Sequence, residues 1–369
     1  MQTTIGIGLL GCGIVGGGVA ERLLAGEPRL PGVAHELRAI AVRNLERQRD
    51  VAIPRSLLVD SANSILSDSA IDIVVETIGG TDVAGDLIER ALDRGCHVVT
   101  ANKALIGSQG PRLHALAARR GVALRYEAAV GGALPLLRTI DDALASDPIE
   151  GFVGVLNGTC NAILGAMEQG ASFAEALADA QQNGYAEADP SEDIEGTDSA
   201  HKLSILIQRA FGAAVITPRL RYRGIVGIDG EALRRYRKRG YRMKLLAAAR
   251  RDRDGIAAEV APALVPCEHP LGALEGAQNG VLFYARDAGE LYLRGVGAGR
   301  PATSSAILSD LTSVLRGIAS RNDARLEWRA FAPTLDVRPI FPDAIAIWND
   351  LFLTAPATQL DAAHASPAQ

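Results

Sequence analysis

The sequence predicts an α/β protein in which a doubly wound parallel sheet precedes a second, α+β domain. The chain has 369 residues, of which 48% are hydrophobic, and this length exceeds one ordinary core. Strand and helix patterns alternate up to about residue 148, and the alternation then changes. We therefore expect domains at residues 1–148 and 149–320. The C-terminal segment 321–369 is expected to return in part to the first domain, with a disordered tail after Gln359.

The first motif is a strand, a glycine turn and a helix. Apolar residues and glycines from Thr4 to Leu10 lead into a G-x-G-x-x-G turn, and a helical pattern follows. In this setting the glycines permit the tight turn, the approach of a pyrophosphate and close helix packing. The pattern predicts a Rossmann dinucleotide-binding domain, with the pyrophosphate at the helix N-terminus. The expected contacts are Gly11, Cys12, Gly13, Ile14, Val15 and Gly16.

The second strand, expected at Leu37 to Val42, ends at the position that selects the cofactor. An NAD-specific site usually places an acid there to bind the ribose 2′-hydroxyl, but this sequence reads Arg43-Asn44. An arginine can neutralise a 2′-phosphate, so Arg43 favours NADP. An exposed arginine that binds no ligand is the alternative.

The alternation continues with further expected elements of the first sheet. They are a strand Ile71–Ile78, a helix Asp86–Arg94, a strand His97–Thr100, a helix Gly110–Arg120 and a strand Ala123–Ala128. In doubly wound sheets, ligands bind at the carboxyl ends of the strands. The small and polar residues at those ends are therefore candidates for the cofactor site: Thr77, Ala101, Asn102 and Lys103.

The second domain is predicted to start with a strand at Glu150–Leu156 that runs into a polar turn. Ser172 and Glu175 have the spacing of a capping box, which opens a helix ending at Asn183-Gly184. A strand Ala257–Leu264 and a hairpin of Gly280–Ala285 with Glu290–Gly295 follow, and then a glycine loop that leads into a helix. Exposed sheet edges in this domain predict a homodimer or a dimer of dimers.

An acidic stretch from Asn183 to Lys202 lies between two helices of this domain. Its carboxylates are Glu187, Asp189, Glu192, Asp193, Glu195 and Asp198. Asp198 and Lys202 are four residues apart and so share one face of a helix. A solvated loop is the commoner reading of such a stretch taken alone. The apolar stripe after Lys202 favours a partly buried site. We expect Glu192 and Glu195 to face solvent and Asp189 to fix the turn before Pro190.

Composition excludes several classes of protein. The net charge of −5 argues against a general polyanion binder, and the basic run Arg234–Arg239 reads as a solvated helix face, so we expect no nucleic acid partner. No apolar stretch has the length of a membrane span. The cysteines are Cys12, Cys96, Cys160 and Cys267, with no CxxC pair, which indicates reduced thiols in the cytoplasm.

Several segments together resemble the homoserine dehydrogenases. The block Gly184-Tyr185-Ala186-Glu187-Ala188-Asp189-Pro190, followed by Asp193 to Lys202, is specific to this family among Rossmann proteins. The other matching segments are Gly11 to Gly16, Ala101 to Lys103, Glu127 to Pro135, Gly154 to Asn161 and Gly295 to Asp310. The resemblance implies reversible NAD(P)-dependent oxidation of L-homoserine to L-aspartate 4-semialdehyde, a step in threonine and methionine biosynthesis.

The resemblance also implies roles for residues, by position. Lys202 is similar to the catalytic lysine, Asp198 to the aspartate beside it, and Lys103 to a second lysine where cofactor and substrate meet. Glu187 and Asp193 are similar to the residues that hold the substrate amine. Gly158 and Thr159 line the same region, and Gly299 belongs with the cofactor contacts. The family also binds a monovalent cation, usually sodium, through carbonyl oxygens that correspond to Glu127, Val130, Gly132 and Leu134.

The residue types suit this chemistry. Hydride leaves an alcohol carbon only as the hydroxyl proton leaves, so a group that exchanges protons must contact that oxygen. Burial would lower the pKa of Lys202, whereas Asp198 would raise it, and the sequence leaves that balance open. Two alternatives are a related Rossmann oxidoreductase for another small amino or hydroxy acid, and a silent NAD(P)-binding sensor. The intact Glu187, Asp198 and Lys202 argue against the sensor.

Three features depart from the family pattern. Many members carry a C-terminal ACT domain or a fused aspartate kinase. This chain ends too soon for the first and lacks the second, so we expect no ACT-mediated inhibition by excess threonine. Asn44 replaces a frequent aspartate, and Arg300 in Gly299-Arg300-Pro301 replaces a bulkier apolar residue. Both differences bear on cofactor preference and on the native substrate.

Overall fold

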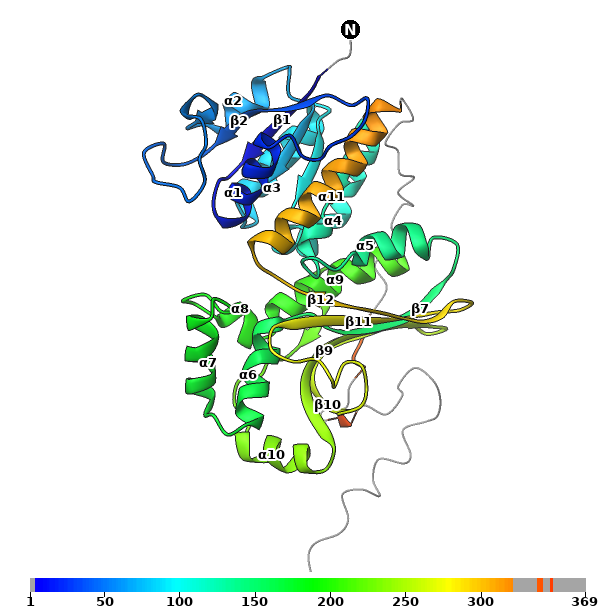
Figure 1. Ribbon diagram of the computed structural model, residues 1–369. Helices are drawn as coiled ribbons and strands as arrows, with labels where there is room; N and C mark the ends of the chain where they lie inside the picture. Colours follow the sequence, from blue (N-terminus) through cyan, green and yellow to red (C-terminus); the bar gives the residue numbers. More distant parts are fainter. Residues whose placement is uncertain (1–3, 321–336, 341–345, 348–369) are drawn as a thin grey trace, which may run out of the picture.

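The computed structural model describes residues 4–320, 337–340 and 346–347, which form two stacked lobes (Figure 1). The first lobe contains a six-stranded parallel sheet of order β3-β2-β1-β4-β5-β6. Its strands are β1 (Ile5–Leu10), β2 (His35–Ala41), β3 (Leu58–Val59), β4 (Ile73–Glu76), β5 (His97–Thr100) and β6 (Leu124–Arg125). This is the doubly wound sheet that the alternating pattern predicts.

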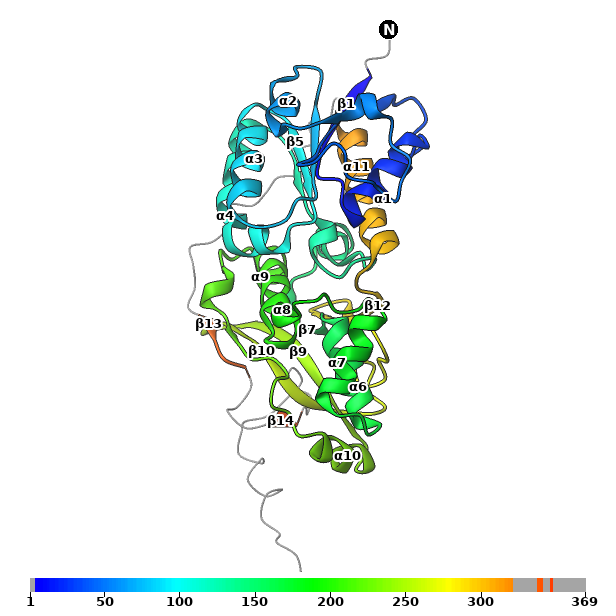
Figure 2. The same ribbon diagram turned by 90° about the vertical axis from the view of Figure 1, so that its left-hand side faces the viewer.

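Helices cover both faces of the first sheet (Figure 2). Ile7, Leu9 and Val75 point to one face and pack with α1 (Ile14–Leu24) and α11 (Arg300–Ala319). Leu10, Val74 and Val98 point to the other face and belong to the larger core cluster, which includes residues of α2 (Ala62–Ser67), α3 (Asp82–Asp93) and α4 (Lys103–Arg120). Alternate residues of a strand face opposite sides, so these buried strands need apolar residues at both positions.

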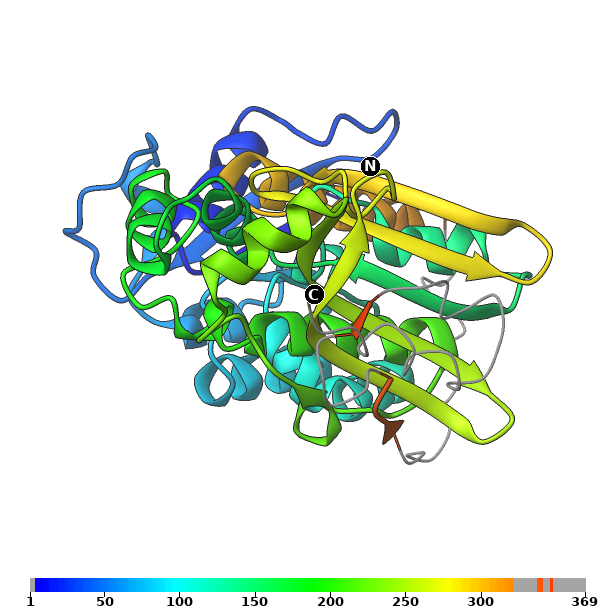
Figure 3. The same ribbon diagram turned by 90° about the horizontal axis from the view of Figure 1, so that it is seen from below.

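The second lobe is built on a mixed sheet of order β12-β11-β7-β9-β10-β13. The long strands are antiparallel: β7 (Ile149–Val155), β9 (Tyr241–Asp252), β10 (Gly255–Pro266), β11 (Gln278–Ala285) and β12 (Gly289–Val296). The short strands β8 (Arg221–Tyr222), β13 (Val337–Arg338) and β14 (Ala346–Ile347) pair with β10. The hairpins β9–β10 and β11–β12 extend to the same side of the molecule (Figure 3).

Two helices of the second lobe, α8 (Ser191–Ile194) and α9 (Thr197–Phe211), carry half of the acidic stretch. The lobe also contains α6 (Gly158–Glu168), α7 (Phe173–Gln182) and α10 (Gly230–Lys238). The capping box at Ser172 and Glu175 is present as predicted. A 3-10 turn at Glu127–Ala129, the short helix α5 (Leu136–Arg138) and a π-helical turn at Thr139–Ala143 connect the two lobes.

The parallel helices α4 and α9 pack closely across the junction of the lobes. Ser204 Oγ donates to the Gly107 carbonyl oxygen at 2.9 Å, and a Cβ on Gly110 would lie 2.5 Å from Gln208 Oε1. Both glycines are buried, and a side chain at either would push the helices apart. The N-terminal turns of the two helices are therefore held side by side.

Three elements differ from the sequence-based expectations. Helix α4 begins at Lys103 instead of Gly110, because the Asn102 side chain accepts from the Leu105 amide and caps it there. Strand β9 was not predicted. Helix α11 lies inside the range given to the second domain, yet its apolar side packs against α1 of the first lobe.

The structure describes two short parts of the predicted C-terminal segment 321–369. Residues 337–338 and 346–347 pair with β10 of the second sheet, while α11, which precedes the segment, packs on the first sheet. The partial return of the segment to the first domain stays a prediction. The predicted tail after Gln359 lies outside the described residues. Among the helices that the structure describes, none has the length and apolar character needed to cross a bilayer.

Candidate active site

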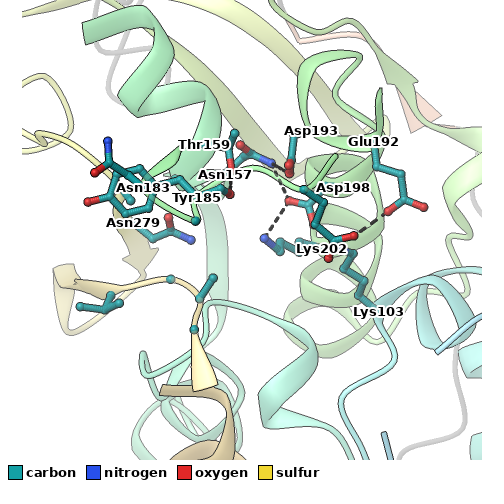
Figure 4. A pocket seen from close by; sticks show the side chains of 18 of the residues that line it. Lys103, Asn157, Thr159, Asn183, Tyr185, Glu192, Asp193, Asp198, Lys202 and Asn279 are labelled. Atoms are coloured by element: carbon teal, nitrogen blue, oxygen red, sulfur yellow. Dashed lines mark hydrogen bonds and ion pairs between the residues drawn. The ribbon is translucent and has the colours of Figure 1, made fainter. Parts of the chain in front are cut away.

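A cavity of about 690 Å³ lies where the two lobes meet (Figure 4). The second lobe supplies most of its wall, from the turn after β7, the acidic stretch and the first turns of α9. Two further segments close it, the start of β11 and the loop Val296–Gly299 that leads into α11. Lys103, the first residue of α4, enters from the first lobe. The wall is therefore shared between the predicted dinucleotide and substrate domains.

Asp198 is the charged centre of the cavity. It lies in the first turn of α9, is 2% exposed, and accepts from Lys202 Nζ at 2.7 Å and from Lys103 Nζ at 2.7 Å. Asn157 Nδ2 also donates to it, at 2.9 Å. Asp198 and Lys202 are on one face of the helix, as their spacing predicts. Three donors thus surround one buried carboxylate, and two of them are lysines.

The charges fix the ionisation of Asp198 and Lys103. Burial alone would raise the pKa of Asp198, but Lys202 and Lys103 outweigh it and hold the pKa well below its usual range. Burial alone would lower the pKa of Lys103, but the charge and hydrogen bond of Asp198 raise it above its ordinary value of 10.5. Asp198 is therefore a carboxylate and Lys103 an ammonium at neutral pH.

Asp193 differs from its neighbour in the direction of its pKa shift. Burial first, and the charge of Asp198 second, raise the pKa of Asp193 above 3.8. A hydrogen bond from Asn157 Nδ2 at 2.6 Å partly offsets this. One asparagine therefore contacts both acids, and its Oδ1 accepts from the Cys160 amide to cap α6.

The turn after β7 also positions Lys202. Lys202 Nζ donates to the Leu156 carbonyl oxygen at 2.7 Å, and Asn279 Nδ2 donates to the same oxygen at 3.0 Å. Thr159 Oγ1 donates to the Tyr185 carbonyl oxygen at 2.6 Å, which ties α6 to the acidic stretch. The Lys202 side chain is 12% exposed, so its ammonium is positioned by two oxygens in a largely dry environment.

The cavity wall contains eight of the residues predicted for the site. They are Lys103, Gly158, Thr159, Glu187, Asp193, Asp198, Lys202 and Gly299. Glu192, expected to face solvent, lies at the rim with a side chain that is 63% exposed and is 3.8 Å from Lys103. Glu195 is exposed, and Asp189 Oδ1 accepts from the Ser191 amide and so shapes the turn, as expected.

The glycine turn lies outside the cavity wall and has the form of a phosphate cradle. Gly11 has a φ of +96°, and a Cβ on Gly16 would lie 2.3 Å from the Gly11 carbonyl oxygen. A Cβ on Gly13 would have no atom within 4 Å, and no side chain caps α1 there. Free amides at the N-terminus of an 11-residue helix, next to open space, fit a pyrophosphate.

The other predicted cofactor residues surround this turn. Thr77 Oγ1 contacts the carbonyl oxygens of Leu10 and Gly11, both at 3.1 Å, and so supports the turn. Asn102 Nδ2 donates to the Gly80 carbonyl oxygen at 2.6 Å. Ala101 follows β5, and Arg43 is exposed two residues after β2. Cys12, Ile14 and Val15 lie in the turn and the first turn of α1.

The residues predicted to bind a cation lie in the buried segment between β6 and α5. The carbonyl oxygens of Glu127 and Leu134 each accept one turn hydrogen bond, from Val130 and Leu136 respectively, and each keeps a second lone pair. Val130 and Gly132 are buried in the same segment. Neutral oxygen donors of this kind suit a hard cation. The part of the chain that the structure describes holds no cluster of three or more His, Cys, Asp or Glu arranged for a metal.

Two asparagines of the site were not assigned roles from the sequence. The sequence indicates only that Asn157 lies in a turn, and its contacts with Asp193 and Asp198 depend on residues 36 and 41 positions away. An asparagine before a predicted helix is a capping signal, which could have drawn attention to it. No comparable signal in the sequence marks Asn279.

Two models of known protein families match the chain. The sequence model of homoserine dehydrogenase matches residues 135–312, and the model of the homoserine dehydrogenase NAD-binding domain matches residues 11–127. The chain belongs to the homoserine dehydrogenase family. It is therefore an NAD(P)-dependent oxidoreductase that acts on a CH–OH group, and the glycine turn and the cavity are the two parts that such an enzyme requires.

Individual homoserine dehydrogenases are similar over most of their length. The enzyme of Synechocystis sp. is 39% identical over 326 residues, which cover 87% of this chain and 75% of that protein. The enzyme of Bacillus subtilis is 36% identical over 318 residues, covering 85% and 73%. The crystal structure of a homoserine dehydrogenase from Thiobacillus denitrificans has a TM-score of 0.85 and 38% identity, and covers 91% of this chain and 80% of that one.

One solved homoserine dehydrogenase also contains a cofactor. A hyperthermophilic archaeal homoserine dehydrogenase in complex with NADPH has a TM-score of 0.71 at 25% identity, and covers 84% of this chain and 97% of that one. The similarity extends over both lobes. It agrees with a dinucleotide site on the first sheet of this homoserine dehydrogenase family member.

Proposed function

We propose that the cavity binds L-homoserine with its hydroxyl at Lys202, and that Lys202 exchanges the hydroxyl proton as L-aspartate 4-semialdehyde forms. The observation that carries this proposal is Lys202 itself, held by Asp198 and the Leu156 carbonyl oxygen in the wall of the cavity. A nicotinamide held at the dinucleotide site would supply the hydride acceptor for the alcohol carbon. In the reverse direction, the Lys202 ammonium polarises the semialdehyde carbonyl and returns the proton.

The remaining polar groups of the cavity can each bind a different part of the substrate. Glu187 and Asp193 are carboxylates of the wall on the side of the acidic stretch, where they can hold the substrate ammonium. Gly158 and Thr159 lie at the N-terminus of α6, which favours the negative end of an amino acid. Lys103 bridges Asp198 to the first lobe, so it lies between the substrate and the dinucleotide site.

The test is turnover of homoserine by Lys202→Met, a variant close in size that cannot exchange a proton. We expect kcat to fall by about 100-fold or more, in line with the loss of an acid–base group, while cofactor affinity stays the same. Lys238→Met, in the last turn of α10 and outside the cavity wall, is the control. Turnover by Lys202→Met near the wild-type rate would refute the role of Lys202.

We propose that the enzyme prefers NADP to NAD. Arg43 follows β2 with no acid at that strand end, and Arg49 NH2 donates to the Asn44 carbonyl oxygen at 2.7 Å, which closes the loop beside Arg43. Two arginines at this place favour a 2′-phosphate. Steady-state kinetics with both cofactors tests this. Arg43→Ala should lower the NADP to NAD ratio of kcat/KM by about tenfold, and an unchanged ratio would remove Arg43 from the site.

We propose a sodium ion at the carbonyl oxygens of Glu127, Val130, Gly132 and Leu134. It would brace the buried segment that joins the first sheet to α5. Its support is the donor type and the spare lone pairs described above. Sodium chloride should raise the melting temperature and the activity more than choline chloride of the same ionic strength. Equal effects of the two salts would count against the ion.

We propose that two copies associate through the second sheet. Strand β12 is an edge strand of the described sheet, and most of its residues are exposed or half-buried. A second copy would satisfy its free backbone groups. Light scattering at micromolar concentration should give the mass of a dimer or tetramer, and a monomer would exclude this arrangement.

We also propose that the enzyme works in the cytoplasm. All four cysteines are free thiols, and Cys96 and Cys160 are buried. Free thiols are typical of a reducing compartment. Fractionation of cells that produce the protein would test this, and recovery in an oxidising compartment would contradict it.

A further inference from the structure

Asn279, the second residue of β11, is a buried amide in the cavity wall with one side unused. It is 1% exposed, and Figure 4 shows Lys202 pointing toward it. Its Nδ2 donates to the Leu156 carbonyl oxygen at 3.0 Å, which fixes the orientation of the amide because Oδ1 cannot donate to a carbonyl. Its Oδ1 is buried and has no hydrogen-bond partner among the residues that the structure describes.

Asn279 packs against the loop that leads from β12 into α11. Gly297 passes directly against the amide, since a Cβ on Gly297 would lie 2.1 Å from Nδ2 and 2.4 Å from Oδ1. Gly297 belongs to the loop that leads into α11, where Arg300 pairs with Glu21 of α1 at 2.7 Å. Asn279 therefore lies between Lys202 and the segment that runs toward the glycine turn.

A buried acceptor that has lost its water and gained no partner is destabilising. Such an atom in a cavity wall is explained when a ligand supplies the donor. Under the proposed function, Glu187 and Asp193 hold the substrate ammonium and Lys202 contacts the hydroxyl. The cofactor would bring the donors that remain, which are its ribose hydroxyls and the N–H of the nicotinamide carboxamide. The carboxamide is the one beside the ring carbon that accepts the hydride, and so the one nearest to the hydroxyl contacted by Lys202.

We propose that Asn279 Oδ1 accepts a hydrogen bond from the carboxamide N–H of the bound nicotinamide. The proposal rests on the proposed function and adds a cofactor-binding residue to it. The two polar atoms of the Asn279 amide would then act differently. Nδ2 donates to the Leu156 carbonyl oxygen that also positions Lys202, and Oδ1 sets the orientation of the nicotinamide ring about its glycosidic bond. One side chain thereby aligns the proton-exchanging group with the hydride acceptor.

The test compares binding of two cofactors by calorimetry, without substrate. The 3-acetylpyridine analogue of NADP has a methyl group in place of the carboxamide NH2, so it lacks the donor. We expect the wild-type protein to bind NADP about tenfold more tightly than the analogue, and Asn279→Ala to bind the two about equally. Dividing the NADP-to-analogue affinity ratio of the wild-type protein by that of the variant removes intrinsic differences between the two cofactors. The same preference in both proteins would overturn the proposal.

A second analogue and a control variant complete the experiment. The thionicotinamide analogue keeps the NH2 group, so the wild-type protein should bind it about as tightly as NADP. Asn63→Ala, on the exposed surface of α2, should keep the wild-type preference. The wild-type comparison of the three cofactors needs no variant, so misfolding of Asn279→Ala cannot hide the result. No preference in the wild-type protein also overturns the proposal.

The substrate arm separates this inference from the proposed function. If Asn279→Ala keeps the cofactor preference and raises only the KM of homoserine, Oδ1 faces the substrate and the proposal is wrong. If Lys202→Met keeps full turnover, the proposed role of Lys202 fails, but the calorimetric preference of the wild-type protein for NADP is unaffected. The two failures are therefore distinguishable.

Discussion

Replacing Asp198 by asparagine should damage both stability and catalysis, because it leaves two lysines without their shared counterion. The substitution keeps the shape of the side chain but removes its charge. It also places an NH2 group where Asp198 now faces the ammonium of Lys103 or Lys202, both at 2.7 Å. At least one donor must then face another donor.

The magnitude follows from the burial of each partner. The Lys202 side chain is 12% exposed, so breaking its pair with Asp198 leaves a largely buried charge, at a cost of about 3–5 kcal/mol in the free energy of unfolding. The Lys103 side chain is 34% exposed, and water screens it, so it adds at most about 1 kcal/mol. Catalysis should fall about 100- to 1,000-fold, the usual effect of losing one electrostatic group of a site.

Urea unfolding and kcat with homoserine measure the two effects. Glu192→Gln is the matched control, because Glu192 is 3.8 Å from Lys103 with a side chain that is 63% exposed, and it should change stability by less than about 0.5 kcal/mol. Adding Lys202→Met to Asp198→Asn should restore part of the stability but none of the activity, since it removes the unpaired charge. A loss of less than about 1 kcal/mol in Asp198→Asn would refute this reasoning.

The same substitution predicts a pH dependence. The pKa of Asp198 is held below its ordinary value of 3.8, so the native state keeps a carboxylate that the unfolded chain would protonate first. Its contribution to stability is therefore complete above pH 3.8 and is lost as the pH falls further. The stability difference between the wild-type protein and Asp198→Asn should stay constant from pH 7 to 5 and shrink below pH 3.8.

Three further predictions concern other parts of the molecule. Gly13→Ala should leave thermal stability unchanged, because its Cβ meets no atom within 4 Å, yet weaken cofactor binding about tenfold or more in calorimetry; unchanged affinity would remove the pyrophosphate from this turn. Gly132→Ala should lower the melting temperature more than Gly121→Ala. Both glycines have a positive φ, +59° and +68°, but a Cβ on Gly132 would lie 2.4 Å from Gly297, whereas a Cβ on Gly121 would meet nothing within 4 Å. Equal losses would show that backbone strain alone, and not the contact with Gly297, lowers the melting temperature. Burial, and next the charge of Arg242, lower the pKa of Lys244 from 10.5 to about 7, so the native state releases a proton that the unfolded chain keeps. Stability should rise with pH above 7 in the wild-type protein and less in Lys244→Met, as measured by urea unfolding at pH 7, 8 and 9, and parallel curves would contradict the shift.

The sequence predicted those parts of the fold that local patterns encode. The glycine turn places α1 directly after β1, and the capping box opens α7 at Phe173. Both signals act over a few residues, so they survive without knowledge of the tertiary structure. The common helix face of Asp198 and Lys202 follows from their spacing in the same way.

Elements set by tertiary packing were harder to predict. Strand β9 contains Leu245, Leu246 and three alanines, residues that favour a helix, and eight successive positions of the strand are buried. A strand covered on both faces shows no alternation, so the sequence has no period of two to detect. The expected start of α4 was Gly110, but the Asn102 cap begins the helix at Lys103.

The contacts of the site depended most on distant residues. Asn279 reaches the Leu156 carbonyl oxygen only because β11 pairs with β7, and Lys103 reaches Asp198 only because α4 packs on α9. No pattern along the chain records these neighbours. Sequence reasoning could therefore name the charged residues of the cavity but could not state which atoms they contact.

The close packing of α4 on α9 sets the distance between two charged residues of the candidate active site. Small residues at Gly107 and Gly110 set how near the two helices lie, and the first turns of those helices present Lys103 and Asp198 to each other at 2.7 Å. The separation between the two lobes is thus set by van der Waals contacts that lie about one to two helical turns from Lys103. A single methyl group added at Gly107 would push α4 away from α9 and separate Lys103 from Asp198, although it would touch neither substrate nor cofactor.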